Sequence, residues 1–162
     1  PLVLAAGDSP APIMDALKAV DGAYTVNLER RFQARNAAGY EVELLAAPSR
    51  MGVYPKTEGL RPVPDMVEQE WLLLGRPVDE VVVDRSRQAC RIVAPDPRWM
   101  ALHKLWIADK PARNPRKKDK DRQQGERLLS LVERAMPHYR IDDDFIRTVP
   151  DKLRRYLPRQ AT

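Results

Sequence analysis

The fold of this chain is organised around Pro95-Asp96-Pro97-Arg98-Trp99-Met100-Ala101-Leu102-His103-Lys104-Leu105-Trp106-Ile107. Asp96 can cap the N-terminus of a helix, and Pro97 suits the first helical position. On a helical wheel the side chains are apolar on nearly every side, so this helix should be buried. Lys104 is the exception, because a lysine on a buried helix must snorkel to water, find a partner or face a polar cavity.

A second helix is predicted after a break that contains two prolines. Its apolar stripe, made of Leu128, Leu131, Val132 and Ala135, continues toward the N-terminus in steps of three and four. The continued line reaches Gln124, Asp121 and Lys117, so the wheel predicts that these polar side chains face inward. Lys117 and Asp121 can also support each other as an i,i+4 pair. A solvated first turn beside a snorkelling Lys104 explains the same pattern.

Composition narrows the class of protein and its partners. The chain has 162 residues, 43% of them hydrophobic, which is enough for one compact unit with a core. A formal charge of +5 favours an anionic partner such as a nucleotide, a nucleic acid or phosphate. The single cysteine, Cys90, excludes an internal disulfide and a cysteine-based zinc site, and it fits a reducing, cytoplasmic compartment. No apolar run approaches the ~20 residues of a membrane span, and no signal peptide is visible.

The first part of the chain predicts a small sheet with one helix, the strands lying at 2–6, 23–27, 31–34 and 40–45 and the helix at 12–20. In the strand at 40–45, alternation places Glu41 and Glu43 on one face. Their carboxylates should lie roughly 6.5–7 Å apart along the strand. Such a pair can serve a divalent metal or general-base chemistry, or it can be the exposed polar face of a half-buried sheet.

The remaining segments predict a long loop, a hairpin and further helices: a loop at 46–64, a short helix at 66–74, hairpin strands at 78–83 and 89–94, and a last helix that opens at 141–144 and restarts at 150–151. The three aspartates at 142–144 suit a helix N-terminus better than a metal site. His103 and His138 are far apart in sequence and are predicted to be structural. Neither a phosphate-binding glycine loop nor a G-x-S-x-G elbow is found.

Two motifs carry a resemblance to a known family. The stretch from Pro95 to Leu105, followed by Lys117-x-x-Lys120-Asp121-x-x-Gln124, resembles the downstream signature of bacterial nucleotidyltransferase-like proteins of the DNA polymerase β superfamily. The strand Gly39-Tyr40-Glu41-Val42-Glu43-Leu44-Leu45 is similar to a strand that precedes this signature in the family. The order and spacing agree from about Pro12 to Val132.

The resemblance implies an α+β fold, with a small mixed β-sheet, packed helices and a C-terminal helical region. It divides the chain into a partial nucleotidyltransferase-like α/β region at 1–94, which includes the hairpin, and a helical region at 95–162 that packs on it. The implied reaction is Mg²⁺-dependent transfer of a nucleoside monophosphate from a nucleoside triphosphate to a hydroxyl acceptor, which is RNA, protein or a small molecule.

Site residues follow from the same resemblance. Glu43, with Glu41, corresponds to a metal-site carboxylate or to the general base. Lys104, Lys117 and Lys120 would meet phosphate oxygens, Asp121 would orient a lysine, and Gln124 would contact the nucleotide or the second substrate. If so, the Glu43 carboxylate should lie within roughly 10 Å of the Lys104 ammonium, which is about one screening length.

The family's upstream motif, a Gly-Ser turn followed by Asp-x-Asp, is not found in the sequence, and Glu43 replaces the usual aspartate. We therefore expect the metal-binding pair to lie upstream of Pro1 and this chain alone to be inactive. Two glutamates without a third ligand should hold Mg²⁺ only weakly. The alternative is a non-catalytic RNA- or protein-binding module that retains the fold, favoured by the net charge and the basic stretch from 111 to 127. The oligomeric state does not follow from the sequence.

Overall fold

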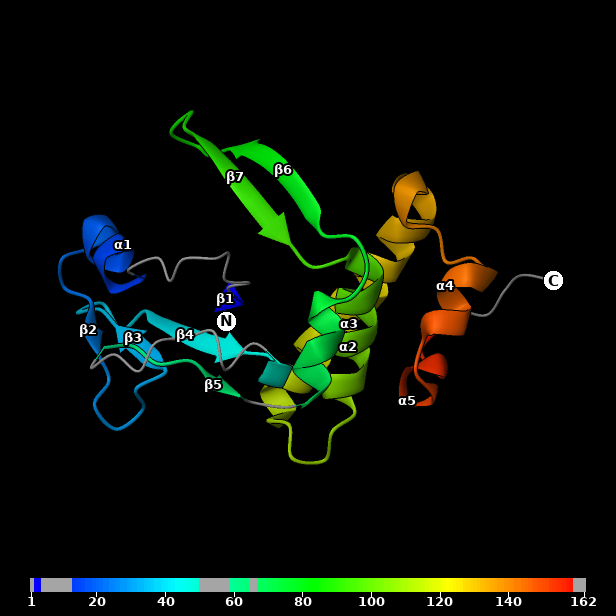
Figure 1. Cartoon of the computed structure of the whole chain (residues 1–162), viewed down its shortest axis with the longest axis horizontal. Coiled ribbons are helices and arrows are strands. Elements are labelled where there is room, and N and C mark those ends of the chain that lie inside the picture. Colours follow the sequence, from blue (N-terminus) through cyan, green and yellow to red (C-terminus); the bar gives the residue numbers. More distant parts are fainter. Residues whose placement is uncertain (1, 4–12, 50–58, 65–66, 159–162) are drawn as a thin grey trace. The chain divides into compact units, whose positions relative to one another are not determined.

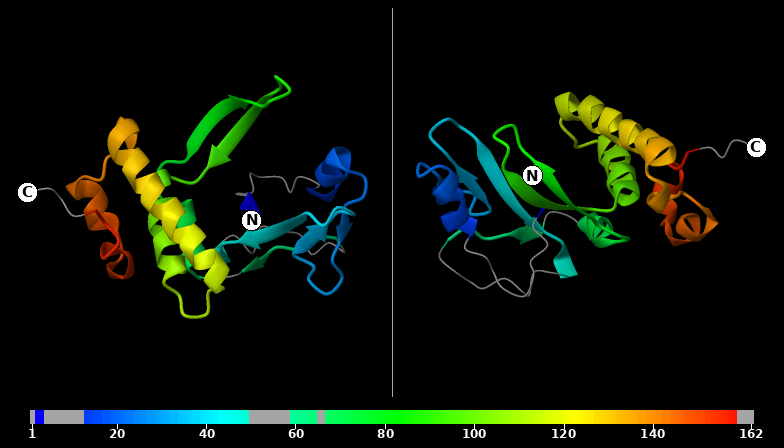
Figure 2. Two further views of the ribbon diagram at one scale, coloured as in Figure 1. Left: turned by 180° about the vertical axis from the view of Figure 1, so that it is seen from behind. Right: turned by 90° about the horizontal axis from the view of Figure 1, so that it is seen from above.

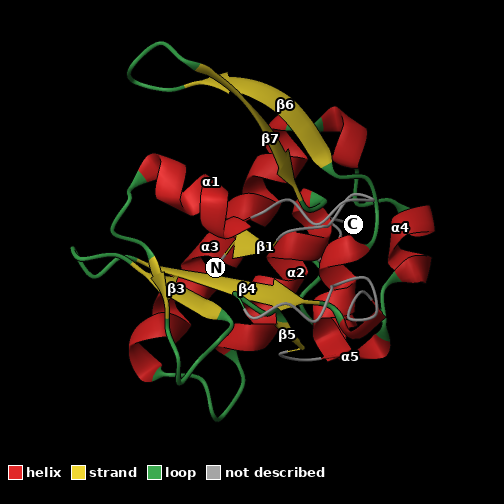
Figure 3. Cartoon of the chain, turned by 60° about the vertical axis from the view of Figure 1, so that its left-hand side comes forward, coloured by secondary structure: helices red, strands yellow, loops and turns green. Residues whose placement is uncertain are grey.

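A computed structural model of the chain describes residues 2–3, 13–49, 59–64 and 67–158. They belong to two compact units, Pro1–Glu70 and Trp71–Thr162, where the length of the chain had led us to expect one. Each unit contains both helix and strand (Figure 3). The predicted α+β fold is confirmed.

The first unit is built on a small mixed sheet. Its strands are β1 (Leu2–Val3), β2 (Thr25–Val26), β3 (Gln33–Arg35), β4 (Glu41–Ala46) and β5 (Val63–Pro64), and α1 (Ile13–Val20) precedes β2. The order is β1-β4-β3-β2, and β5 also pairs with β4. β3 is antiparallel to β2 and β4, whereas β1 and β5 are parallel to β4.

All four predicted strands of this sheet are present, although their bounds differ by a few residues from the predicted ones. β5 is an additional strand in the segment that we expected to be a loop; it was not predicted because a two-residue strand leaves no periodic pattern to detect. Residues 50–58 of that expected loop lie outside the described part. The last residues of β4 are buried while Glu41 is exposed, so the strand runs from a polar end to an apolar end.

In the second unit, β6 (Val78–Val83) and β7 (Ala89–Ala94) form the predicted hairpin, paired from Val78↔Ala94 to Val83↔Ala89. The 3-10 helix η2 (Val67–Leu73), predicted as a short helix, precedes it and crosses the boundary between the units. At the base of the hairpin, Arg76 N–H donates to Asp96 Oδ2 at 3.0 Å and Tyr139 O–H donates to Pro77 O at 3.2 Å. These bonds tie the hairpin to the helices within the second unit, which begins at Trp71, whereas the sequence analysis placed its division after residue 94.

Helices α2 (Pro97–Ala108) and α3 (Pro115–Ala135) pack side by side in the second unit (Figures 1 and 2). Asp96 caps α2 as predicted, since its side chain accepts from Arg98 N–H, and Asn114 caps α3 in the same way. The buried residues of α2 surround the helix, as the sequence predicted: Pro97, Trp99, Ala101, Leu102, His103, Leu105, Trp106 and Ala108. A Cβ on Gly125 would meet Leu105 Cγ at 2.7 Å, so α3 approaches α2 closely at this glycine.

The buried face of α3 differs from the predicted stripe. Its buried residues are Asp121, Gly125, Leu129 and Val132, whereas Leu131 and Ala135 of the predicted stripe are exposed. The buried line is therefore rotated by roughly 65° around the helix axis from the line that the leucines suggested. The burial of α2 was predicted correctly, whereas of the predicted inward line of α3 only Asp121 and Val132 are buried.

The chain ends in three short helical segments: η3 (Pro137–Tyr139), α4 (Asp143–Thr148) and α5 (Asp151–Arg154). Asp142 caps α4 by accepting from Phe145 N–H at 2.9 Å, so the capping interpretation of the three aspartates is confirmed. Arg98 pairs with the buried Asp96 at 2.7 Å and stacks over the Phe145 ring at 4.2 Å, which joins α2 to α4. Within the described residues, every helix is too short or too polar to span a membrane.

Candidate functional site

A buried carboxylate on α3 holds two cations. Lys104 Nζ on α2 donates to Asp121 Oδ1 at 2.9 Å. Arg113, in the turn between the two helices, donates to Asp121 Oδ2 from Nε at 2.8 Å and from Nη2 at 2.5 Å. The sequence left three possibilities for Lys104, namely snorkelling to water, a partner or a polar cavity. In the structure Lys104 has a charged partner. We call these three residues the Asp121 cluster.

Burial within the Asp121 cluster is uneven. Only 3% of the Asp121 side chain is exposed, against 26% for Lys104 and 27% for Arg113. Burial acts to raise the pKa of Asp121, but the hydrogen bonds from Lys104 and Arg113, and their charges, outweigh it and lower that pKa below its usual value. The carboxylate is thus ionised at neutral pH, and the cluster carries a net positive charge.

Donors remain in the Asp121 cluster after its internal bonds are made. Lys104 uses one of three ammonium hydrogens on Asp121, and among the described residues Asp121 is the sole acceptor for the Arg113 guanidinium. The Nη1 edge of Arg113 and the free hydrogens of Lys104 can therefore take oxygen atoms of an anion. One carboxylate holds both cationic side chains in place, so these side chains would lose little conformational freedom when they bind a phosphate group.

The other predicted phosphate contacts lie outside this cluster. Lys117 and Gln124 are exposed, so the prediction that they face inward with Asp121 is wrong. Lys120 is also exposed, and as the residue before Asp121 it is turned by roughly 100° around the helix axis. Within the described residues Asp121 pairs with Lys104 and Arg113, and the expected Lys117–Asp121 pair is not formed.

Two carboxylates converge on one amide in the first unit. Gln33 Nε2 on β3 donates to Glu41 Oε2 and to Glu43 Oε1, each at 3.2 Å. The two glutamates therefore share a face of β4, as alternation predicted. Gln33 is only 3% exposed, and Asn27 Nδ2 donates to its Oε1 at 2.9 Å, which fixes the amide in place.

The donor set around Gln33 fits part of a Mg²⁺ site. The described residues hold no group of three or more carboxylate, histidine or cysteine side chains placed to bind a metal ion. A pair of carboxylates is nevertheless a usual protein contribution to a Mg²⁺ site, since this ion keeps several waters and takes phosphate oxygens as further ligands. In this structure the amide hydrogens of Gln33 lie between the two carboxylates, in the position that a bound cation would take. The Glu43–Lys104 distance joins residues of different units and stays a prediction.

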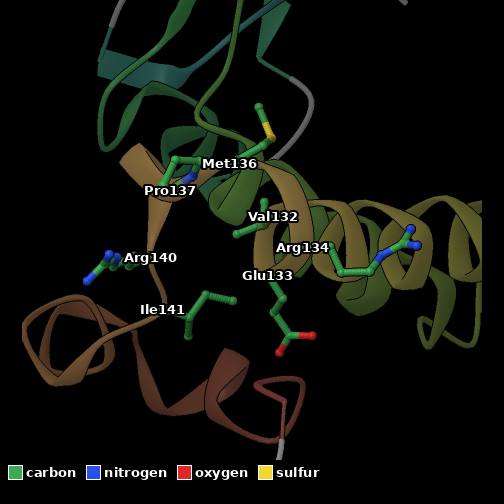
Figure 4. Close-up of a pocket in the computed structure, with 7 residues that line it drawn as sticks. All are labelled: Val132, Glu133, Arg134, Met136, Pro137, Arg140 and Ile141. Atoms are coloured by element: carbon green, nitrogen blue, oxygen red, sulfur yellow. The ribbon is translucent and has the colours of Figure 1, made fainter.

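A pocket of about 380 Å³ lies at the other end of α3, and Figure 4 shows its lining residues: Val132, Glu133, Arg134, Met136, Pro137, Arg140 and Ile141. Val132 is eleven residues beyond Asp121, which is roughly 16 Å along the helix axis. The charged side chains around the pocket are of both signs. It is therefore separate from the Asp121 cluster and has no feature that selects an anion.

Sequence reasoning missed two residues of these arrangements. Arg113 lies in the break between the two helices, where the helical periodicity used for the prediction does not hold. The one available signal was its position directly before Asn114 and Pro115, which begin α3. Gln33 interrupts an apolar strand between Phe32 and Ala34, and its register partner is Glu43. A buried glutamine opposite a glutamate was the available signal. Of the two histidines, His103 packs against Trp71 and Trp106, which fits the predicted structural role, and His138 is exposed.

Comparison with known proteins agrees with the motifs. No curated protein and no solved structure matches the chain. The model of one family, NTP_transf_8, described as nucleotidyltransferase, matches residues 1–149, which cover nearly the whole sequence and include both the Glu41–Glu43 strand and the Asp121 cluster. The chain therefore belongs to this nucleotidyltransferase family.

Proposed function

We propose that this chain serves the transfer of a nucleoside monophosphate from a nucleoside triphosphate to a hydroxyl acceptor. In this reaction the acceptor oxygen bonds to the α-phosphorus, the bond from that phosphorus to the pyrophosphate oxygen breaks, and pyrophosphate leaves. The hydroxyl proton must pass to a base. Membership of the nucleotidyltransferase family supports this class of reaction.

The Asp121 cluster is the observation that carries the proposal. Its two cations come from different segments, yet one buried carboxylate holds both, and each keeps about a quarter of its side chain exposed. Lys104 and Arg113 would donate to oxygens of the triphosphate and balance the charge that grows on the leaving pyrophosphate. Asp121 would act through them, by holding their side chains in position.

Glu41 and Glu43 are proposed for the acceptor side of the reaction. Glu43 would accept the hydroxyl proton or, with Glu41, hold Mg²⁺ by its carboxylate oxygens. When bound, this ion would neutralise phosphate charge. Gln33 would keep the two carboxylates together, since it donates to both. Lys117, Lys120 and Gln124 remain proposals from the family motif, and their exposure fits contacts with a substrate that extends over the surface of α3.

Isothermal titration with ATP, GTP, CTP and UTP in the presence of Mg²⁺ tests the nucleotide site. We expect at least one of the four to bind, and we expect Lys104→Gln or Arg113→Gln to weaken that binding by about ten- to a hundredfold, the value of one charged hydrogen bond. Arg85→Gln is the matched control, because it removes one exposed cation from the turn of the hairpin. Binding of none of the four nucleotides, or equal weakening by Arg85→Gln, would contradict the proposal.

A further inference from the structure

A line of cations follows the outer side of α3. Arg116, Lys120, Arg127 and Arg134 are all exposed. At roughly 100° per residue their side chains fall within a narrow arc, opposite the buried residues Asp121, Gly125, Leu129 and Val132. From first to last the line spans about 27 Å of helix. We call these four residues the α3 cation line.

Ion pairs within the helix do not explain the α3 cation line. Lys120, Arg127 and Arg134 have no Asp or Glu at three or four positions to either side, where a helical ion pair would form. Arg116 has one such residue, Asp119, but no ion pair joins them in the described part of the chain. Arg116 and Lys120 are instead four positions apart with like charge, which disfavours a helix slightly.

Other cations of the same helix behave differently. Arg122, on another side of α3, pairs with Asp109 at 2.6 Å, and Asp109 also accepts from Tyr156 O–H at 2.8 Å. Arg122 therefore has a structural role that ties α3 to the end of α2 and to the C-terminal segment. The α3 cation line makes no such tie, because among the described residues the only side chain of the line that donates a hydrogen bond is Arg134, and its acceptor is Ser130 O of the same helix.

The geometry of the α3 cation line selects one kind of partner. A straight row of cations that have no ion-pair partner in the described part of the chain suits a polymer with regularly spaced negative charges, and its length lets it follow several successive phosphates of one strand. Gln123 lies within the row and is exposed, so it adds a donor and an acceptor for sugar or base groups. An anionic membrane fits less well, because Leu129 and Val132 of α3 are buried and Leu131 is the one large apolar side chain of that helix that is exposed.

We propose that the α3 cation line binds the phosphate backbone of a nucleic acid strand. The binding itself does not depend on nucleotide transfer. That the bound strand is the hydroxyl acceptor rests on the proposed function. Lys120, which the family motif assigns to phosphate, would then contact the acceptor strand and not the nucleotide held by the Asp121 cluster.

Fluorescence anisotropy of the whole chain with labelled single-stranded RNA and DNA of mixed sequence tests the proposal. We expect binding at low salt, and we expect the logarithm of the binding constant to fall linearly with the logarithm of the salt concentration. The double variant Arg127→Gln with Arg134→Gln should weaken binding about fivefold or more and make the salt slope shallower by about 1.4, the loss of two phosphate contacts on a single strand. The ratio of RNA to DNA affinity separates the two kinds of strand.

A matched control changes the net charge equally elsewhere. Lys18→Gln with Arg85→Gln removes two exposed cations from α1 and from the hairpin turn. This control should leave the salt slope unchanged, and nucleotide titration should be unchanged in both double variants. Equal weakening by the control, absence of binding to either strand at low salt, or tighter binding to vesicles of phosphatidylcholine and phosphatidylserine than to RNA would each overturn the proposal. Lost nucleotide binding with intact strand binding would count against the proposed function alone.

Discussion

Asp121 on α3 accepts a hydrogen bond from Lys104 on α2 at 2.9 Å and is itself almost wholly buried. Asp121→Asn leaves two cations without their counter-charge, so we expect the free energy of unfolding to fall by about 3 kcal/mol. Urea unfolding measures this change. Asp119→Asn is the control, since Asp119 is exposed two positions away and should change stability by less than about 0.5 kcal/mol. Similar effects of the two variants would show that the cluster adds no stability.

The same carboxylate predicts a pH dependence. Burial acts to raise the pKa of Asp121, and the bonds from Lys104 and Arg113 more than reverse it, so the folded pKa lies below the ordinary value of 3.8. Between these two values the unfolded chain binds more protons than the folded chain, and stability rises with pH. The contribution of Asp121 is therefore complete above pH 3.8 and is lost as the pH falls through the folded pKa.

Urea unfolding between about pH 6 and pH 2.5 measures this dependence, because that range brackets the ordinary carboxyl pKa of about 3.9. The difference in stability between the native chain and Asp121→Asn should be constant at the upper end and should shrink below pH 3.8. A difference that stays constant over the whole range would contradict the lowered pKa.

Gly125→Ala should destabilise the chain although alanine favours a helix. The new Cβ would meet Leu105 Cγ at 2.7 Å and the Ala101 carbonyl oxygen at 3.0 Å, and the backbone atom cannot turn away. Overpacking of this kind costs about 1–3 kcal/mol, against about 1 kcal/mol gained in helix propensity. Thermal unfolding should give a lower Tm. Gly22→Ala, which meets nothing within 4 Å, should leave Tm unchanged or raise it, and the reverse order would disprove a close approach of α2 and α3.

Gly75→Ala tests the base of the hairpin. Gly75 has φ +77°, and an added Cβ would overlap Asp96 Oδ2, the oxygen that also accepts from Arg76 N–H. We expect a loss of about 3 kcal/mol or more, because backbone strain and the displaced buried carboxylate add together. Gly39→Ala carries similar strain, at φ +82°, but meets only the end of the Arg35 side chain. It should cost about 1–2 kcal/mol, and an equal loss in both variants would mean that Asp96 plays no part.

We predict that Gln33 controls how Glu41 and Glu43 respond to a cation. Gln33→Glu removes the shared donor and adds a third carboxylate, so the variant should unfold at a lower temperature without metal and regain stability in millimolar MgCl₂. The native chain should gain less from the same salt, because its carboxylates already share an amide. Thermal unfolding with and without MgCl₂ measures both effects, and Gln123→Glu on the exposed side of α3 is the control. A variant no more responsive to Mg²⁺ than the control would rule out a cation site at this position.

Local features followed directly from the sequence. The Asp96 and Asp142 caps, the hairpin at 78–94 and the shared face of Glu41 and Glu43 were all predicted correctly. Each depends on residues within a few positions of one another, so turn chemistry, capping and alternation are sufficient. The need of Lys104 for a partner was also visible, because charge on an apolar helix is costly wherever the helix packs.

Only the tertiary structure decided which residues meet that need. The wheel of α3 was set by its leucines, but Leu131 is 43% exposed and Leu129 is buried, because Gly125 lets α2 approach on a different side. That shift brings Asp121 alone of the predicted polar line inward and leaves Lys117 and Gln124 in water. Arg113 joins Asp121 from an irregular turn, where no period exists to extrapolate. The sequence thus determined that α2 is buried and that its lysine requires a counter-charge, whereas the side of α3 that supplies it depends on how closely two backbones can pack.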